Sequence, residues 1–175
     1  MRATITLLLC GLLSAAVPLY GQSTTPLGHG SALERLTRPL EGGIAHYSSR
    51  DRTGGNDDWV AIAPGETLTM VDHEGAGVVR RLWVTVAPRD NRELQRQMIV
   101  RAYWDGESEP SVEVPLSDFF GMGFGEWKDF ISLPLTMTSG GYNSYWPMPF
   151  RRRARITITN TASLAAERFY YNIDV

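Results

Sequence analysis

From about residue 66 to the end of the chain, apolar and polar residues alternate in short runs. In the segment VVRRLWVTV, the side chains of Leu82, Val84 and Val86 fall on one side, and those of Arg81 and Trp83 on the other. A period of two is typical of a β-strand with one buried face. Further segments rich in β-branched and aromatic residues also predict strands; they are ETLTMVD, QMIVRAYWD, SVEVPL, ARITITN and RFYYNIDV.

Turn residues separate these predicted strands, as at Pro64-Gly65, in HEGAG and in DGESEP. The segment NRELQRQM between two strands predicts one short crossover helix. Many short strands with irregular connections rich in glycine and tryptophan are typical of a β-sandwich. The pattern therefore predicts an all-β fold, a β-sandwich of the jelly-roll type.

The chain begins with a different pattern. Arg2 precedes the apolar run ITLLLCGLLSAAV, and small residues follow, which is the layout of a secretory signal peptide. The run is shorter than the roughly 20 residues that a membrane-spanning helix needs. We expect cleavage near Gly21, so that residues 1–21 are a signal peptide and 22–30 a flexible leader. This predicts a secreted, periplasmic or cell-envelope protein with no membrane attachment after cleavage.

The length predicts one domain over residues 31–175. Its first segment, SALERLTRPL, has Ser31 in an N-cap position and Glu34 three residues later, so a short N-terminal helix is expected. The last segment, RFYYNIDV, has no turn after it. Because an unpaired aromatic edge strand invites association, we expect the chain to be truncated at its C-terminal end. A final edge strand of a complete domain is the alternative.

Charge and motif content exclude several classes of protein. The net charge is −2 and the basic residues are scattered, unlike the clustered basic face of a nucleic-acid-binding protein. The single cysteine, Cys10, lies in the signal peptide, so neither a disulfide nor a thiolate metal site is expected in the mature chain. The histidines lie on unrelated segments, and no GxSxG, P-loop or Rossmann motif is present. These features argue against serine hydrolases, nucleotide-dependent enzymes and zinc hydrolases.

The segment SSRDRTGGNDDW combines charged, amide and aromatic side chains around a Gly-Gly pair that permits positive φ. Polar groups beside an indole suit a sugar, since they bind vicinal hydroxyls while the ring stacks on C–H groups. A salt-bridged turn with the tryptophan buried is an alternative, and a calcium loop is a third possibility. The candidate sugar-binding residues are Arg52, Asn56, Asp57, Asp58 and Trp59.

Two further segments concentrate aromatic residues. In PLSDFFGMGFGEWKDF, Glu126 precedes Trp127; because desolvation raises a carboxyl pKa, Glu126 is a candidate proton donor. A packed loop between sheets is the alternative. In GGYNSYWPMPF, Tyr145 and Trp146 form an aromatic surface that suits a core, an interface or a ligand.

Four ordered motifs together resemble glycoside hydrolase family 172, formerly catalogued as domain of unknown function 2961. They are SSRDRTGGNDDW, GAGVVRRLWVT, YWDGESEPSVEVPLSDFFGMGFG and YNSYWPMPFRRRARITITN. The resemblance runs from about Leu33 to Val175. Arg50 is a departure, because members of the family often carry an aromatic residue there.

The resemblance implies the first of two jelly rolls in a longer, secreted carbohydrate enzyme that acts on fructofuranosides or arabinofuranosides and forms trimers. It also implies a retaining mechanism with two glutamates about 5 Å apart. The family carries these in its second half, beyond Val175, so no catalytic residue is assigned here and Glu126 becomes a loop residue. Trp127, Tyr145 and Trp146 are expected to line the same cleft as Arg52–Trp59, or a subunit interface.

The expected partners are an oligosaccharide or glycan substrate and further copies of the chain, and sugar binding of this kind needs no cofactor. The alternative function is a non-catalytic carbohydrate-binding or trimer-assembly module. A structural jelly roll of the capsid type is the third possibility.

Overall fold

The structure is a computed structural model that describes residues 42–175. The expected signal peptide, the leader and the helix in SALERLTRPL lie outside these residues. Within them, strands dominate, and no helix is both long and apolar enough to cross a membrane. The elements are β1 (His46–Ser48), β2 (Val60–Ile62), β3 (Thr67–Glu74), β4 (Gly77–Val79), β5 (Arg81–Ala87), α2 (Arg92–Gln97), β6 (Met98–Trp104), β7 (Val112–Pro115), α3 (Leu116–Phe119), the 3-10 turn η1 (Gly123–Gly125), β8 (Phe130–Ile131), β9 (Leu135–Thr138), β10 (Gly141–Ser144), β11 (Met148–Phe150), β12 (Arg153–Asn160) and β13 (Ala166–Asp174).

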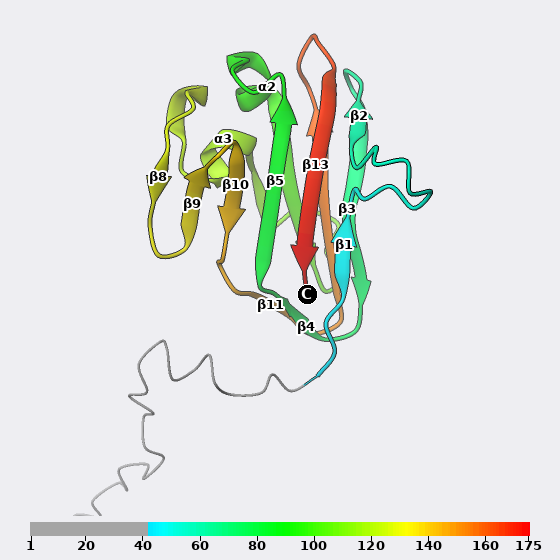
Figure 1. Cartoon of the computed structure of the whole chain (residues 1–175). Helices are drawn as coiled ribbons and strands as arrows, with labels where there is room; N and C mark the ends of the chain where they lie inside the picture. Colours follow the sequence, from blue (N-terminus) through cyan, green and yellow to red (C-terminus); the bar gives the residue numbers. More distant parts are fainter. Residues whose placement is uncertain (1–41) are drawn as a thin grey trace, which may run out of the picture. The chain divides into compact units, whose positions relative to one another are not determined.

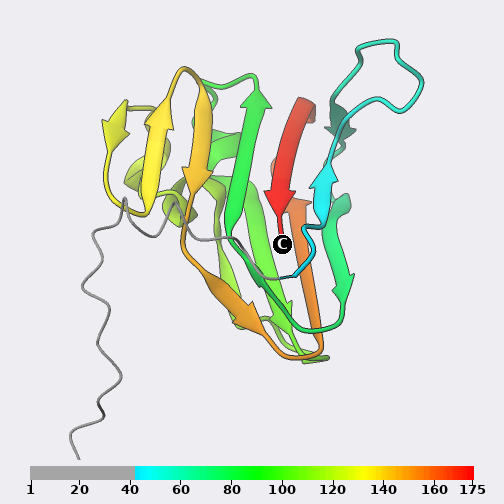
Figure 2. The ribbon, with the colours of Figure 1, turned by 60° about the horizontal axis from the view of Figure 1, so that its bottom comes forward.

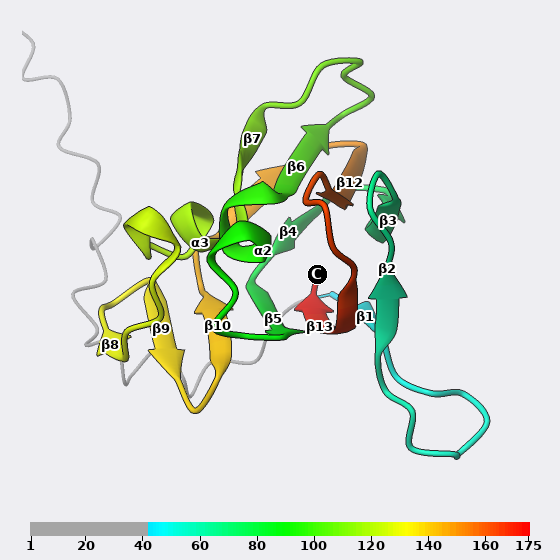
Figure 3. The ribbon, with the colours of Figure 1, turned by 90° about the horizontal axis from the view of Figure 1, so that it is seen from above.

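The strands form two layers (Figures 1 and 3). Sheet A has the order β1-β13-β5-β10-β9-β8, with β2 also paired to β13, and sheet B has the order β3-β12-β6-β7. The small pair β11-β4 lies apart from these two sheets in the pairing. Along the chain, β2, β5, β10 and β13 in sheet A alternate with β3, β6–β7 and β12 in sheet B, which is jelly-roll connectivity. The predicted all-β jelly-roll sandwich is confirmed.

Alternation along the predicted strands decides which side chains enter the core. In β5, Leu82, Val84 and Val86 are buried, whereas Arg81 and Trp83 on the other side are only half-buried. At the centre of sheet B, Ile156 and Ile158 of β12 are also buried, but Thr157 between them is buried as well. Each of the six predicted strand segments forms strand in the structure, and VVRRLWVTV divides into β4 and β5.

The prediction that the last segment, RFYYNIDV, forms an unpaired edge strand is wrong. β13 lies inside sheet A, paired with β5 on one side and with β1 and β2 on the other. Both of its edges are therefore paired within the domain; of its aromatic residues, Phe169 is fully buried, and Tyr170 and Tyr171 are half-buried. The expectation that the chain continues beyond Val175 rests on the family resemblance and stays a prediction.

The crossover helix predicted in NRELQRQM is α2. Its N-cap is Asn91, whose Oδ1 accepts a hydrogen bond from the backbone N of Leu94 at 3.0 Å. The buried Gln95 of α2 donates to the backbone oxygen of Arg89 at 2.9 Å and to the hydroxyl of Tyr142 in β10. The helix is thereby fixed to sheet A at the side where the aromatic segments lie.

Candidate functional site

The loop of residues 49–59 joins β1 to β2 at one edge of sheet A and projects from it (Figure 2). Ser49 closes its base. The Ser49 hydroxyl donates to the backbone oxygen of Asp58 at 2.7 Å and accepts from the backbone N of Tyr171 at 3.0 Å. Because Tyr171 belongs to the central strand β13, the base of the loop is tied to the core.

Two of the three loop carboxylates hold the loop itself. The Asp51 carboxylate accepts hydrogen bonds from the backbone N and the hydroxyl of Thr53, each at 2.7 Å. The Asp58 carboxylate accepts from the backbone N of Asp51 at 2.7 Å. Gly54 and Asn56 adopt positive φ angles of 84° and 65°, which fold the loop back on itself. The loop is thus an Asx turn closed by carboxylate–backbone bonds, and no ion pair of Arg52 with its aspartates exists in the described chain.

These contacts predict a titration. The hydrogen bonds from Thr53, first its hydroxyl and then its backbone N–H, lower the pKa of Asp51. A lowered folded-state pKa means that the contacts are intact above the ordinary pKa and are lost as pH falls through the folded one. We expect NMR titration of the Asp51 carboxyl carbon to give a midpoint below the ordinary value of about 3.9. Thr53→Ala, which removes only the hydroxyl, should raise that midpoint. A midpoint at or above the ordinary value would contradict the turn.

Three loop side chains remain open to a ligand. Arg52, Asn56 and Asp57 are exposed, and none of their side chains has a hydrogen-bond or ion-pair partner among residues 42–175. Trp59 beside them is half-buried, with the guanidinium carbon of Arg168 5.8 Å from its ring centroid. The loop therefore presents a cation, an amide and a carboxylate next to a partly open indole.

The loop side chains are not arranged as the ligands of a calcium ion. The Asp51 and Asp58 carboxylates are turned toward backbone N–H groups. Across the described residues, no group of three or more histidine, cysteine, aspartate or glutamate side chains is placed to hold a metal ion.

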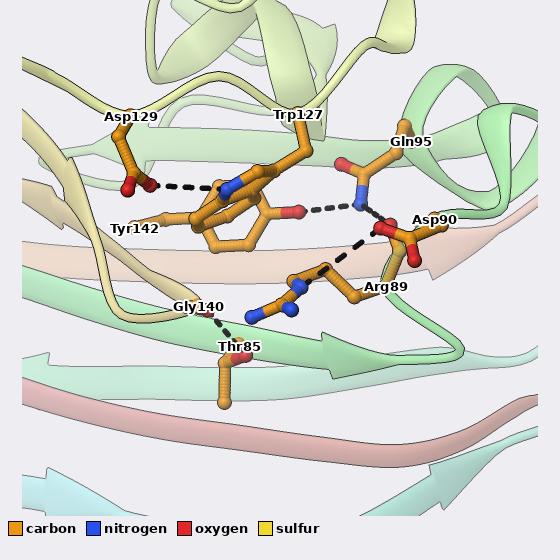
Figure 4. A network of polar contacts seen from close by, with 8 residues as sticks. All are labelled: Thr85, Arg89, Asp90, Gln95, Trp127, Asp129, Gly140 and Tyr142. Carbon is orange, nitrogen blue, oxygen red and sulfur yellow. Dashed lines mark hydrogen bonds and ion pairs between the residues drawn. The ribbon is translucent and has the colours of Figure 1, made fainter.

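Trp127 packs against Tyr142 of β10 (Figure 4). Its Nε1 donates to Asp129 at 3.1 Å, its ring centroid lies 5.1 Å from that of Tyr142, and the Arg89 guanidinium lies 5.0 Å away. Tyr142 is fully buried, and burial raises its pKa far above the ordinary range. Trp127 thus forms part of a packed wall between sheet A and α2.

Glu126, next to Trp127, is half-exposed and forms ion pairs with Arg92 at 3.3 Å and Lys128 at 3.8 Å. The desolvation that the proton-donor hypothesis required is therefore missing. The packed-loop alternative describes this segment better.

Tyr145 and Trp146 directly follow β10 and are 44% and 51% exposed. The backbone N of Tyr145 donates to the oxygen of Pro134 at 2.8 Å, so both residues lie beside the β8–β9 hairpin. Strands β13 and β5 separate β10 from β1, a distance of about 14 Å across the sheet. The structure does not bring the eight candidate residues together in one cleft: Arg52–Trp59, Trp127 and Tyr145–Trp146 occupy three places along sheet A.

A shallow hollow of about 200 Å³ lies on sheet B, lined by Tyr103, Gly106, Glu107, Arg153 and Arg155. Its charged groups already have partners. Arg153 forms two hydrogen bonds of 2.7 Å with Asp72, and Arg155 lies 3.9 Å above the ring of Tyr103. The guanidinium groups of Arg153 and Arg155 are therefore already engaged by other side chains.

Sequence reasoning did not select the outer face of sheet A, where Trp83 lies between Asn143 and Asn172 in register. These residues belong to three segments far apart in the chain. The alternation of apolar and polar residues around Trp83 indicated that its side chain faces away from the core. It did not indicate which residues of other strands lie beside Trp83.

Comparison with known proteins agrees with the motif pattern. No curated protein matches the chain. Residues 55–171, more than half of the chain, match the family described as GH172 domain-like. The matched range begins inside the loop, at Gly55, so it includes Asn56 to Trp59 but not Arg52; it contains both aromatic segments and ends within β13, at Tyr171. The chain therefore belongs to the GH172 domain-like family, a family of carbohydrate-active proteins.

Proposed function

We propose that the chain is the N-terminal half of a secreted, retaining glycoside hydrolase that acts on fructofuranosides or arabinofuranosides. The observation that carries the proposal is the exposed group Arg52, Asn56 and Asp57 beside Trp59, in a chain of a carbohydrate-active family. The catalytic glutamates are expected beyond Val175, so the role of this domain is to bind and orient the sugar.

Each loop side chain has a chemical role in this proposal. The Arg52 guanidinium donates to ring or hydroxyl oxygens, and the Asn56 amide both donates and accepts. The Asp57 carboxylate accepts from sugar hydroxyls, and charge-assisted bonds of this kind are the stronger ones. Asp58 keeps the loop folded through Asp51 and has a second oxygen with no partner among the described residues. Trp59 offers the accessible part of its indole to the C–H face of the ring.

Substitution of the loop tests this role. We expect Arg52→Ala and Asp57→Ala to weaken binding of neutral arabino- or fructo-oligosaccharides about tenfold or more, because each removes a charge-assisted hydrogen bond. Isothermal titration or NMR titration of the chain measures the affinity. The matched controls are Arg151→Ala and Asp90→Ala, which remove the same charges at exposed positions outside the loop and should leave the affinity unchanged. Equal effects of test and control variants, or no binding of any furanoside, would refute the proposal.

A non-catalytic carbohydrate-binding or trimer-assembly module is the second candidate. It is favoured by the exposed apolar side chains of Ile131 and Leu133 at the β8–β9 hairpin, 79% and 95% exposed, near Tyr145 and Trp146. Large exposed apolar side chains that cluster mark contact surfaces. Sedimentation of the chain, compared with that of a Leu133→Ser variant, distinguishes the candidates: a trimer that the substitution dissociates favours assembly through this hairpin.

A further inference from the structure

The outer face of sheet A carries a straight row of neutral side chains across five strands. Their neighbours in sequence, Leu82, Tyr142 and Ile173 among them, are buried in the core, so the row points away from it. The pairing register places one residue of each strand side by side. This central row is Ser48, Asn172, Trp83, Asn143 and Thr136.

Trp83 at the middle of the row lies over the backbone of β10. A Cβ atom on Gly141 would come within 2.6 Å of the Trp83 Nε1, so only glycine leaves room for the indole. Trp83 is half-buried, and within residues 42–175 its Nε1 has no hydrogen-bond acceptor. The side-chain amide of Asn143, on the adjacent strand, also has no partner in that part of the chain. An aromatic ring and two neutral polar groups are thus held together at the surface.

The charged side chains of one adjacent row lie close to one another. The row next to it holds His46, Asp174 and Arg81 in register. The Asp174 carboxylate lies 2.7 Å from the His46 Nδ1 and 3.9 Å from Arg81. The central row itself contains only hydroxyl, amide and indole groups. This distribution complements an uncharged polyol better than a nucleic acid or an acidic peptide.

The central row extends from the loop of residues 49–59 toward Tyr145, two regions that lie on different strands of sheet A. It begins at Ser48, immediately before the loop of residues 49–59, which extends on the side of sheet A that faces away from sheet B (Figure 3). At the other end, Tyr145 directly follows β10, and continued alternation from Asn143 places it on the same side of the sheet. From Ser48 to Thr136 the row crosses four strand spacings, roughly 19 Å. That length accommodates several sugar rings.

We propose that this outer face, centred on Trp83, binds an uncharged oligosaccharide laid across the strands of sheet A. Trp83 supplies the stacking surface, and Asn143 supplies hydrogen bonds on one side of it. On the other side the Asn172 Oδ1 lies 3.2 Å from the His46 Nε2, and the Asn172 amide N–H groups supply hydrogen bonds to the ligand. The loop of residues 49–59 binds one end of the same chain. The inference rests on the proposed carbohydrate function and adds a second binding surface to it.

The proposal is tested by measuring how affinity depends on the number of sugar residues in the ligand. The probes are neutral arabino- and fructo-oligosaccharides from one to six residues, titrated into the chain while the tryptophan indole NMR signals are followed. We expect affinity to rise with length in the unaltered protein. Trp83→Ala and Asn143→Ala should weaken binding of the longest probes about tenfold, the loss expected for one aromatic contact or one hydrogen bond, and should not change monosaccharide binding.

Controls separate this surface from the loop. Tyr103→Ala changes an aromatic residue on the outer face of sheet B and should leave affinity unchanged. Trp83→Leu retains apolar volume but removes the aromatic ring, and it serves if Trp83→Ala does not fold. If long probes bind but the Trp83 variant without an aromatic ring, Asn143→Ala and Asn172→Ala all bind like the unaltered chain, the surface proposal is overturned while the loop proposal survives. If no probe binds the unaltered protein, both are overturned.

Discussion

Replacing Phe169 with alanine is expected to lower the free energy of unfolding by about 3–5 kcal/mol. The ring is fully buried in the middle of β13, where Phe169 pairs with Val60 of β2 and Val86 of β5. Hydrogen-bonded strands on both sides limit how far the site can collapse, so truncation leaves a cavity. Equilibrium unfolding in urea measures the change.

Tyr145→Ala is the matched control, because Tyr145 is 44% exposed. Its effect should stay within about 0.5 kcal/mol. Since a typical domain is stable by only about 5–15 kcal/mol, the loss at Phe169 would be a large part of the total. Should Phe169→Ala prove no worse than Tyr145→Ala, the central position of β13 in the core would be contradicted.

Replacing Asn160 with leucine is expected to destabilise the domain by about 3 kcal/mol or more. Asn160 is fully buried at the end of β12. Its Nδ2 donates to the backbone oxygens of Ile62 and Leu164, both at 2.9 Å, and its Oδ1 accepts from the backbone N of Ala162 at 3.0 Å. Leucine has a similar size but leaves three backbone groups without partners, and each unmet group costs about 1–3 kcal/mol.

The control is Asn143→Leu, because Asn143 is half-buried on the outer face of sheet A and its amide has no partner in the described chain. The same chemical change there should alter stability by about 0.5 kcal/mol or less. Thermal or urea unfolding of both variants decides the matter. Equal effects would show that the Asn160 contacts do not join β12 to β2 as the structure describes.

The candidate loop shows how far sequence reasoning reaches. The density of charged and amide residues around Gly54 and Gly55 is visible in the sequence and correctly marked an exposed, folded-back segment. The sequence did not show which carboxylates of the loop stabilise its fold and which remain exposed. Asp51 and Asp58 carry the same carboxylate as Asp57, yet they bind backbone N–H groups of the loop, which leaves Asp57 open.

The aromatic segments were predicted less well, because an aromatic residue suits both a core and a ligand site. Trp127 lies in a packed wall with Tyr142 and Arg89, while Tyr145 and Trp146 are exposed. Residue type is the same in both cases. Only the packing of α2 against β10 decides which ring is covered.

The sequence alone determined β3–β7, β12 and β13, because burial of one sheet face imposes alternation that a strand displays by itself; the short strands β1, β2 and β8–β11 were not predicted. It also supplied the ordered motifs that identify the family. The order of strands was decided by tertiary structure, because pairing partners such as β13 and β1 come from opposite ends of the domain. For the same reason, the row of Asn172, Trp83 and Asn143 exists only in the folded sheet, where three distant segments are brought into register by backbone hydrogen bonds.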